Sequence, residues 1–173
     1  MQTAAHNYFE LFGLPSRFAI DIGKLESAFR RLQNELHPDR HVSKSETERR
    51  VALQLSTTVN DAYQTLRHPS SRAQCLIDMT PESAVTEAVS AAFLMEQMEW
   101  HEAIEHACDT RDAKELQMLA RRLRTEMAVQ ENGLEKTLDI QRDFHGAAMR
   151  VNELRFYERL CAEIREALDQ LEE

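Results

Sequence analysis

The chain has 173 residues, with only four Gly and four Pro, and carries a formal net charge of −9. The scarcity of Gly and Pro favours helices over turn-rich all-β folds. The acidic excess argues against non-specific nucleic-acid binding, which needs positive charge to release counterions. The charge is uneven, because residues 1–75 carry 10 Lys and Arg against 8 Asp and Glu, whereas residues 76–173 carry 11 against 22. Halves of such different charge indicate surfaces for two different partners.

Nothing in the sequence indicates a membrane segment, a targeting signal or a metal site. No run of apolar residues approaches the roughly 18 that a membrane span needs. The first basic residue is Arg17, so a basic signal-peptide n-region is missing and we expect a cytoplasmic protein. Cys75, Cys108 and Cys161 are widely spaced and form no CxxC pair, which argues against a disulfide framework or a zinc site. Cys161 lies at helical spacing with apolar residues, so we expect a buried, inert thiol.

The first half predicts two long antiparallel helices joined by a polar loop. Asp21 is a suitable N-cap, and the helix after it must end near His37, because Pro38 disfavours the α conformation in the residue before it. Apolar residues on one face of this helix are Ile22, Leu25, Phe29, Leu32 and Leu36. The second long helix spans about residues 46–66, and its apolar face is Val51, Leu55, Val59, Ala62, Tyr63 and Leu66. We expect short flanking helices over residues 7–12 and from Pro69 onward.

Three longer amphipathic helices follow Thr80-Pro81, where we place a boundary between domains 1–79 and 80–173. We expect helices over about 84–107, from about 111, and over about 144–171. Asn132-Gly133 resembles a turn signal, but the apolar phase continues through it, so the second helix is expected to break only at residues 139–144. The prediction is an all-α chain with a helical hairpin followed by a three-helix bundle.

The tripeptide His37-Pro38-Asp39 ends the first long helix and opens the polar loop. Lys24, Arg30 and Arg31 lie off the apolar stripe of that helix. Taken alone, the tripeptide is compatible with a simple proline helix stop. In its setting between two long helices, with residues 59–66 on the second one, it resembles the J-domain of DnaJ-type co-chaperones.

The resemblance extends over both halves to one specialised J-type family, HscB, the co-chaperones of bacterial iron–sulfur cluster assembly. It rests on the segments Asn7-Tyr8-Phe9-Glu10-Leu11-Phe12-Gly13-Leu14-Pro15, Thr65-Leu66-Arg67-His68-Pro69, Arg72-Ala73, Phe93-Leu94-Met95-Glu96-Gln97 and Leu154-Arg155-Phe156. The resemblance implies that the J-domain docks on HscA, a DnaK-class ATPase, and stimulates ATP hydrolysis. It also implies that the acidic bundle holds IscU, the scaffold protein on which the cluster is built.

The same resemblance assigns residues to the two surfaces. The chaperone-binding residues would be His37, Pro38, Asp39, Lys24, Arg30, Arg31 and Arg40. The scaffold-binding residues would be Leu94, Met95, Met98, Glu99, Glu102 and Phe156. Leu36 and Arg40 depart from the aromatic residue and the Lys that J-domains often have, but keep the chemical type. His106 stands where the best-known relative has an acidic residue, so the resemblance leaves its part in scaffold binding open.

The spacing on the helix over 84–107 agrees with a scaffold surface, although that assignment rests largely on the resemblance. Leu94 and Met98 are four residues apart, and they lie roughly opposite the stripe of Phe93, Trp100 and Ile104. An apolar cluster off the core stripe is an exposed patch of the kind that marks partner sites. The alternative is that this helix is buried on two sides.

No enzymatic activity, cofactor or metal ion is expected. The sequence lacks a Gly-rich phosphate loop and an assembled Ser/His/Asp set, and His101 and His106 are not at the i, i+4 spacing of a helical ligand pair. Two other functions stay open: a general J-protein that delivers unfolded clients, and a helical adaptor in which His-Pro-Asp is only a loop. The first lacks support, because no Gly/Phe-rich linker or zinc segment follows the hairpin.

Overall fold

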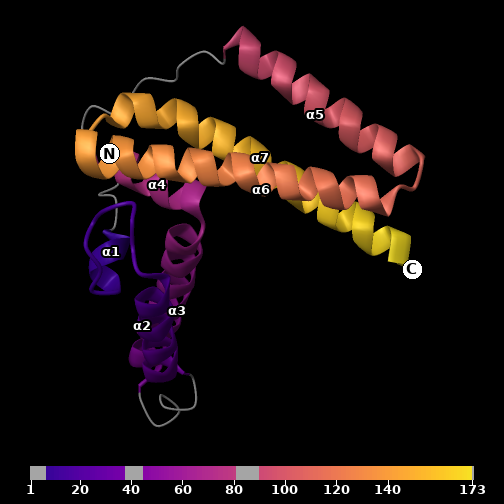
Figure 1. Ribbon diagram of the computed structural model, residues 1–173. Coiled ribbons are helices and arrows are strands. Elements are labelled where there is room, and N and C mark those ends of the chain that lie inside the picture. The colour runs from indigo at the N-terminus through magenta and orange to yellow at the C-terminus, as the bar shows by residue number, and fades with distance from the viewer. Residues whose placement is uncertain (1–6, 38–44, 81–89, 173) are drawn as a thin grey trace. The chain divides into compact units, whose positions relative to one another are not determined.

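A computed structural model describes residues 7–37, 45–80 and 90–172 of the chain (Figure 1). These residues form helices and connecting turns without a strand, which confirms the all-α prediction. The chain divides into two compact units, residues 1–83 and 84–173. The predicted domain boundary lies a few residues before this division. Among the described helices, none combines the length and the apolar character that crossing a bilayer requires.

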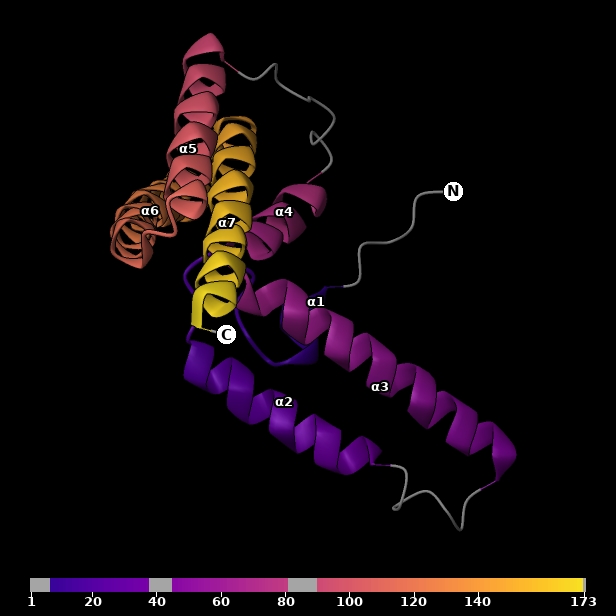
Figure 2. The ribbon, with the colours of Figure 1, turned by 90° about the vertical axis from the view of Figure 1, so that its right-hand side faces the viewer.

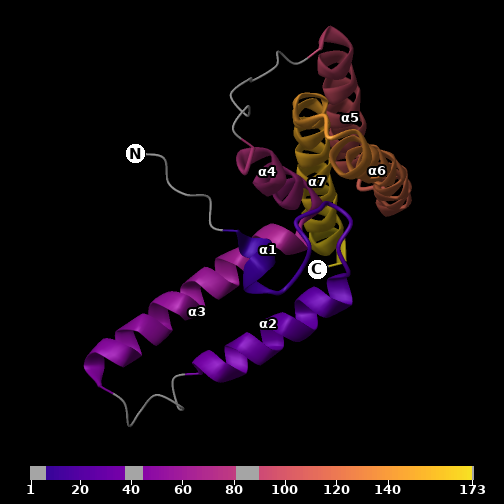
Figure 3. The same ribbon diagram turned by 90° about the vertical axis from the view of Figure 1, so that its left-hand side faces the viewer.

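Unit 1 consists of α1 (Tyr8–Leu11), α2 (Ile22–Leu36), α3 (Glu46–Arg67) and α4 (Pro69–Asp78). Figures 2 and 3 show α2 and α3 side by side and antiparallel, as predicted. The Asp21 carboxylate caps α2 by accepting from the Lys24 amide at 3.1 Å. The helix ends at His37, whose ψ of 131° leaves the α region, as expected for a residue before proline. Ser45 and Glu48 form a reciprocal capping box that starts α3.

The core of unit 1 lies between α1, α3, α4 and the first half of α2. Phe9, Leu25 and Leu66 are fully buried, and the rings of Phe29 and Tyr63 stack with centroids 3.9 Å apart. The prediction that Val51 and Leu55 are on the buried face of α3 was wrong, because they are 51% and 46% exposed. They lie in the first half of α3, whereas α1 and α4 pack beside its second half (Figure 3). Among the described helices, only α2 lies beside the first half. The small Ala52 side chain is buried there instead.

Unit 2 is a bundle of α5 (Ala91–Asp109), α6 (Ala113–Leu134) and α7 (Phe144–Glu172). The helix expected from residue 84 begins only at Ala91, because Ser90 is extended and its hydroxyl caps the Phe93 amide; residues 81–89 lie outside the described residues. Gly133 does not break the second helix, as predicted. The chain continues from α6 into a π-helical segment, η2 (Glu135–Gln141), and breaks only at Arg142, whose φ is 57°.

The bundle core contains both expected and unexpected residues. Trp100, Ile104, Leu116 and Leu123 of α5 and α6 are buried. On α7, Ala147, Val151, Leu154 and Ile164 are buried at helical spacing, and the helix also buries Phe156, Tyr157 and Leu160. Cys161 is half-buried, not buried, and its thiol donates to the Met127 sulfur at 3.6 Å. Burial, the largest cause, raises the pKa of the Cys161 thiol, which favours its protonated form at neutral pH.

Candidate protein-binding surfaces

The exposed side of α2 carries the three predicted basic contacts. The Lys24 ammonium is 3.9 Å from the Asp21 carboxylate, and the Arg30 guanidinium is 3.9 Å from that of Glu26. Both pairs are long and solvent-exposed, so they hold the cations only weakly. Arg31 makes no ion pair with any described residue. All three cations are therefore available to an acidic partner.

The two arginines do not point the same way. Consecutive residues leave a helix about 100° apart, and the structure places Arg31 with Lys24 along a groove that Arg30 does not line. His37 is the exposed C-terminal cap of the same helix. Pro38, Asp39 and Arg40 lie outside the described residues. The structure therefore brings His37 and the basic residues onto one helix, with the cations on two of its faces.

The exposed face of α5 carries the predicted apolar patch. Leu94, Met95 and Met98 are 49%, 65% and 63% exposed. Glu99 and Glu102 are exposed beside them and form an acidic rim. The buried residues Phe93, Trp100, Ile104 and Ala107 occupy the opposite face of the helix. We call Leu94, Met95 and Met98, with the rim of Glu99 and Glu102, the α5 patch.

Phe156 does not lie on this surface. It is 3% exposed, and its ring packs edge-on against Phe93 with centroids 5.5 Å apart. The His101 ring, on the exposed side of α5, meets it at 5.7 Å. Phe156 therefore supports α5 from beneath, and any part that it has in partner binding must act through the position of that helix. His106 is exposed farther along α5.

A partly buried hydrogen-bond network holds α5 on α7, and the sequence did not predict it. The Tyr157 hydroxyl donates to Glu96 Oε1 at 2.7 Å, and the Trp100 indole N–H donates to the same oxygen at 3.2 Å. Burial and the bond to Glu96 raise the pKa of Tyr157 well above its ordinary value. Burial, more than the nearby charges, also raises the pKa of Glu153. The i, i+4 spacing of Glu96 and Trp100 was a usable signal, whereas their partner Tyr157 is 61 residues away from Glu96.

The Arg122 guanidinium lies over the Trp100 ring, 4.5 Å from its centroid, and ties α6 to the same aromatic group. In the described part of the chain, no group of three or more His, Cys, Asp or Glu side chains could hold a metal ion.

Comparisons with known proteins identify the family of this chain. Residues 89–165 match the family model described as the HSCB C-terminal oligomerisation domain. The chain is 42% identical to a co-chaperone protein HscB homolog of Aromatoleum aromaticum, over 96% of both chains. It is 41% identical to a homolog of the same name from Burkholderia thailandensis, over 99% of both.

Solved structures agree with the sequence comparisons. Chaperone HscB from Vibrio cholerae superposes with a TM-score of 0.84 at 36% identity, covering 95% of this chain and 99% of that one. Human co-chaperone protein HscB superposes with a TM-score of 0.81 at 25% identity, covering 95% of this chain and 82% of that one. From this full-length similarity, and from a fold that matches in both units, we conclude that the chain belongs to the HscB family of co-chaperone proteins.

Proposed function

We propose that this chain is a cytoplasmic co-chaperone that links two proteins in iron–sulfur cluster assembly. One partner is an HscA-type, DnaK-class ATPase, whose hydrolysis it stimulates. The other is an IscU-type scaffold protein, which it delivers to that ATPase. Besides family membership, one observation carries the proposal: a basic helix ending in His37 lies in unit 1, and an exposed apolar patch with an acidic rim lies in unit 2.

On the chaperone side, the proposed contact is electrostatic and needs no catalytic group. Lys24, Arg30 and Arg31 are exposed on α2, so they would steer the domain toward an acidic surface and raise the association rate. His37 can both donate and accept a hydrogen bond. Stimulation follows if the complex binds the hydrolysis-competent state of the ATPase more tightly than its other states. The ATPase itself supplies the chemistry, and this chain contributes binding energy.

On the scaffold side, the proposed contact is the α5 patch. Its three apolar side chains are half to two-thirds exposed, so a partner that covers them removes substantial apolar area from water. The acidic rim of Glu99 and Glu102 suits a partner with basic residues around an apolar surface. Phe156 contributes by holding α5 in place through Phe93. The patch and the basic helix belong to different units, so we expect the two binding activities to be separable.

The first experiment tests the chaperone side. His37→Gln removes a titratable ring from an exposed helix end, so we expect the helical circular dichroism spectrum to stay unchanged. Stimulation of a DnaK-class ATPase in single-turnover assays should be lost. His68→Gln is the matched control, because His68 is also exposed but caps α4 without a side-chain hydrogen bond. Unchanged stimulation by His37→Gln would exclude this use of the tripeptide.

The second experiment tests the scaffold side. Leu94→Ala combined with Met98→Ala should weaken binding to an IscU-type scaffold by about tenfold or more, as for truncated interface anchors. Stimulation of the ATPase without scaffold should stay nearly unchanged. Met118→Ala is the control, because this α6 side chain is 57% exposed and lies outside the patch. Equal loss of both activities in the double variant would show that the two surfaces are not separable.

A further inference from the structure

The outward face of α6 differs in charge from the rest of unit 2. Residues 76–173 carry 22 Asp and Glu against 11 Lys and Arg. On α6, however, the glutamates are all half-buried, and the exposed charged residues are all cations. These cations are Lys114, Arg121, Arg122 and Arg124. The face that α6 turns to solvent is therefore basic within an acidic unit.

A single stripe along this face combines cationic and apolar side chains. Successive members are three or four residues apart, so they line up on one side of the helix. Met118 and Val129 are 57% and 54% exposed. We call Lys114, Met118, Arg121, Thr125 and Val129, all of them exposed, the α6 stripe.

The helix holds the stripe in place before any partner arrives. The Asp112 carboxylate caps α6 by accepting from the Lys114 and Glu115 amides at 2.9 and 3.0 Å. On the opposite face of the helix, Leu116 and Leu123 are fully buried in the bundle core. Binding on the stripe therefore needs little further ordering of the chain.

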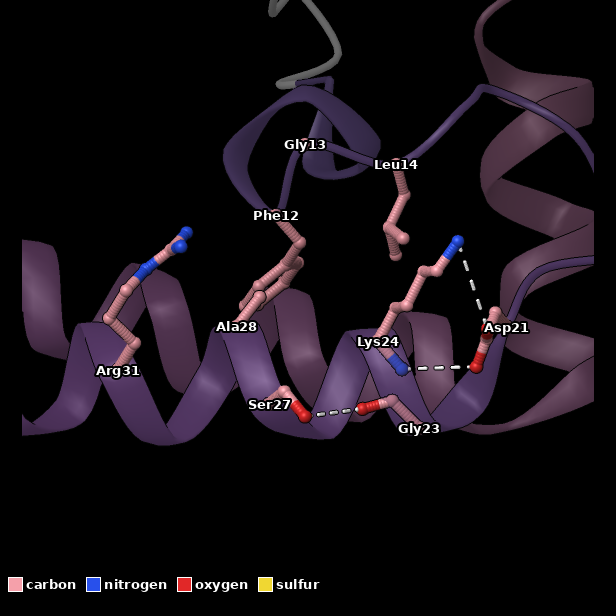
Figure 4. Close-up of a pocket in the computed structure, with 9 residues that line it drawn as sticks. All are labelled: Phe12, Gly13, Leu14, Asp21, Gly23, Lys24, Ser27, Ala28 and Arg31. Atoms are coloured by element: carbon pink, nitrogen blue, oxygen red, sulfur yellow. Dashed lines mark hydrogen bonds and ion pairs between the residues drawn. The ribbon is translucent and has the colours of Figure 1, made fainter.

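The two cations of the stripe are available to carboxylates of a partner. Neither Lys114 nor Arg121 makes an ion pair with a described residue. On α2, by contrast, the Lys24 ammonium is 3.9 Å from the Asp21 carboxylate (Figure 4). Lys114 and Arg121 are seven residues apart, which separates them by about 10 Å along the helix axis.

Other polar groups of this face are engaged within unit 2. The Arg122 guanidinium lies over the Trp100 ring, 4.5 Å from its centroid, and the Thr125 hydroxyl donates to the Arg121 carbonyl at 3.3 Å. The groups left for a partner are the two cations and the apolar side chains of Met118 and Val129.

We propose that the α6 stripe binds an acidic amphipathic helix of another protein. Such a helix places two carboxylates seven residues apart opposite Lys114 and Arg121, and apolar side chains on the same face opposite Met118 and Val129. A nucleic acid is a poorer match, because its affinity comes from phosphate contacts to cations, whereas the stripe also exposes apolar side chains and the neighbouring α5 contains no Lys or Arg. The stripe shares no residue with the two surfaces of the proposed function, so this proposal does not rest on that function.

The binding test uses the full chain labelled with ¹⁵N and a capped, alanine-rich helical peptide. The peptide carries Glu, Leu, Glu and Leu on one face, with successive spacings of four, three and eight residues to match the stripe. We expect amide shift changes at Met118, Arg121 and Thr125. Lys114→Glu combined with Arg121→Glu should weaken the affinity about tenfold, because two exposed ion pairs are replaced by repulsion. The same variant should bind the peptide in which Lys replaces both Glu.

The apolar part of the stripe has its own variant. Met118→Ala combined with Val129→Ala should weaken peptide binding about fivefold, because less apolar area is removed from water. Arg49→Glu combined with Arg50→Glu is the matched control for charge, because both arginines are exposed on α3 in unit 1. This control should leave the affinity unchanged.

Four results would overturn the proposal. They are shift changes confined to residues outside α6, equal weakening by the α3 control, and tighter binding of a single-stranded oligonucleotide that the Met118 and Val129 changes leave unaffected. The fourth is a shift of the stripe amides that depends on protein concentration without peptide, which would identify a second copy of this chain as the occupant.

Discussion

Replacing Tyr157 by Phe tests whether the bond between α5 and α7 stabilises the bundle. The Tyr157 hydroxyl is buried and donates to Glu96 Oε1 at 2.7 Å. A hydrogen bond to a charged group contributes about 1.5–3 kcal/mol. Because Glu96 is only half-buried and keeps the Trp100 donor, we expect a loss of about 1–2 kcal/mol. For a unit of this size, that loss lowers Tm by roughly 6–12 °C.

The only tryptophan of the chain makes the measurement specific for unit 2. Trp100 is 2% exposed in the bundle core, so its fluorescence during urea or thermal unfolding reports on that unit. Tyr63→Phe is the control, because Tyr63 is buried in unit 1 and its change should leave the Trp100 transition in place. Glu96→Gln keeps an acceptor oxygen for Tyr157 and should cost less than Tyr157→Phe. A change below about 0.5 kcal/mol for Tyr157→Phe would refute the reasoning.

The same variant predicts a pH dependence. The pKa of Tyr157 is raised above its ordinary value of 10.0, first by burial and then by the bond to Glu96. The folded state therefore binds the phenolic proton more tightly than the unfolded state does. The contribution of this proton to stability is complete below pH 10 and falls as the pH rises above it. Wild type should lose stability in that range faster than Tyr157→Phe, which has no phenolic proton.

Three further predictions concern stability and reactivity. Burial raises the pKa of Glu153 above its ordinary value of 4.5. The free energy of unfolding therefore falls as the pH rises through that raised value. Glu153→Gln should raise Tm at pH 7 and make Tm less dependent on pH. A Cβ on Gly133 would come within 2.8 Å of the Arg150 guanidinium carbon, the far end of a flexible side chain that can move aside. Gly133→Ala should therefore stabilise the bundle by up to about 1 kcal/mol, measured by urea unfolding. The Cys161 thiol should react with iodoacetamide more slowly at pH 7.5 than glutathione does, and at a similar rate once the chain is unfolded, because burial raises its pKa.

The sequence predicts a helix end correctly where one or two neighbouring residues determine it. Asp21 and Pro38 mark the ends of α2, since a cap and a following proline act within a single turn. The end of the α6 segment was found from the continuing apolar phase, which outweighed the Asn132-Gly133 pair. The sequence does not predict that α5 begins after Ser90. The neighbouring residues favour helix, and no local signal indicates that the Ser90 hydroxyl caps the Phe93 amide.

Contacts between distant segments could not be predicted in this way. Because α7 packs against both α5 and α6, it buries a second set of residues, Phe156, Tyr157 and Leu160. A single apolar stripe with a period of 3.6 residues predicts only one buried face of a helix. Val51 and Leu55 have the right phase for burial, but among the described helices only α2 lies beside the first half of α3. The predicted place of Phe156 on the scaffold surface came from family resemblance, and the structure gives it a supporting position instead.

The α5 helix shows why exposure, and not apolar character alone, identifies the proposed scaffold surface. Phe93 and Leu94 are neighbours in the chain, yet they are 7% and 49% exposed, because one residue step turns the helix by about 100°. The core of unit 2 is formed on the α5 side by the face that carries Phe93, Trp100 and Ile104. Polar residues at Leu94, Met95 and Met98 would keep that core intact and improve solubility. Packing within unit 2 therefore does not account for the second apolar face, which is an exposed surface of the kind that marks partner sites.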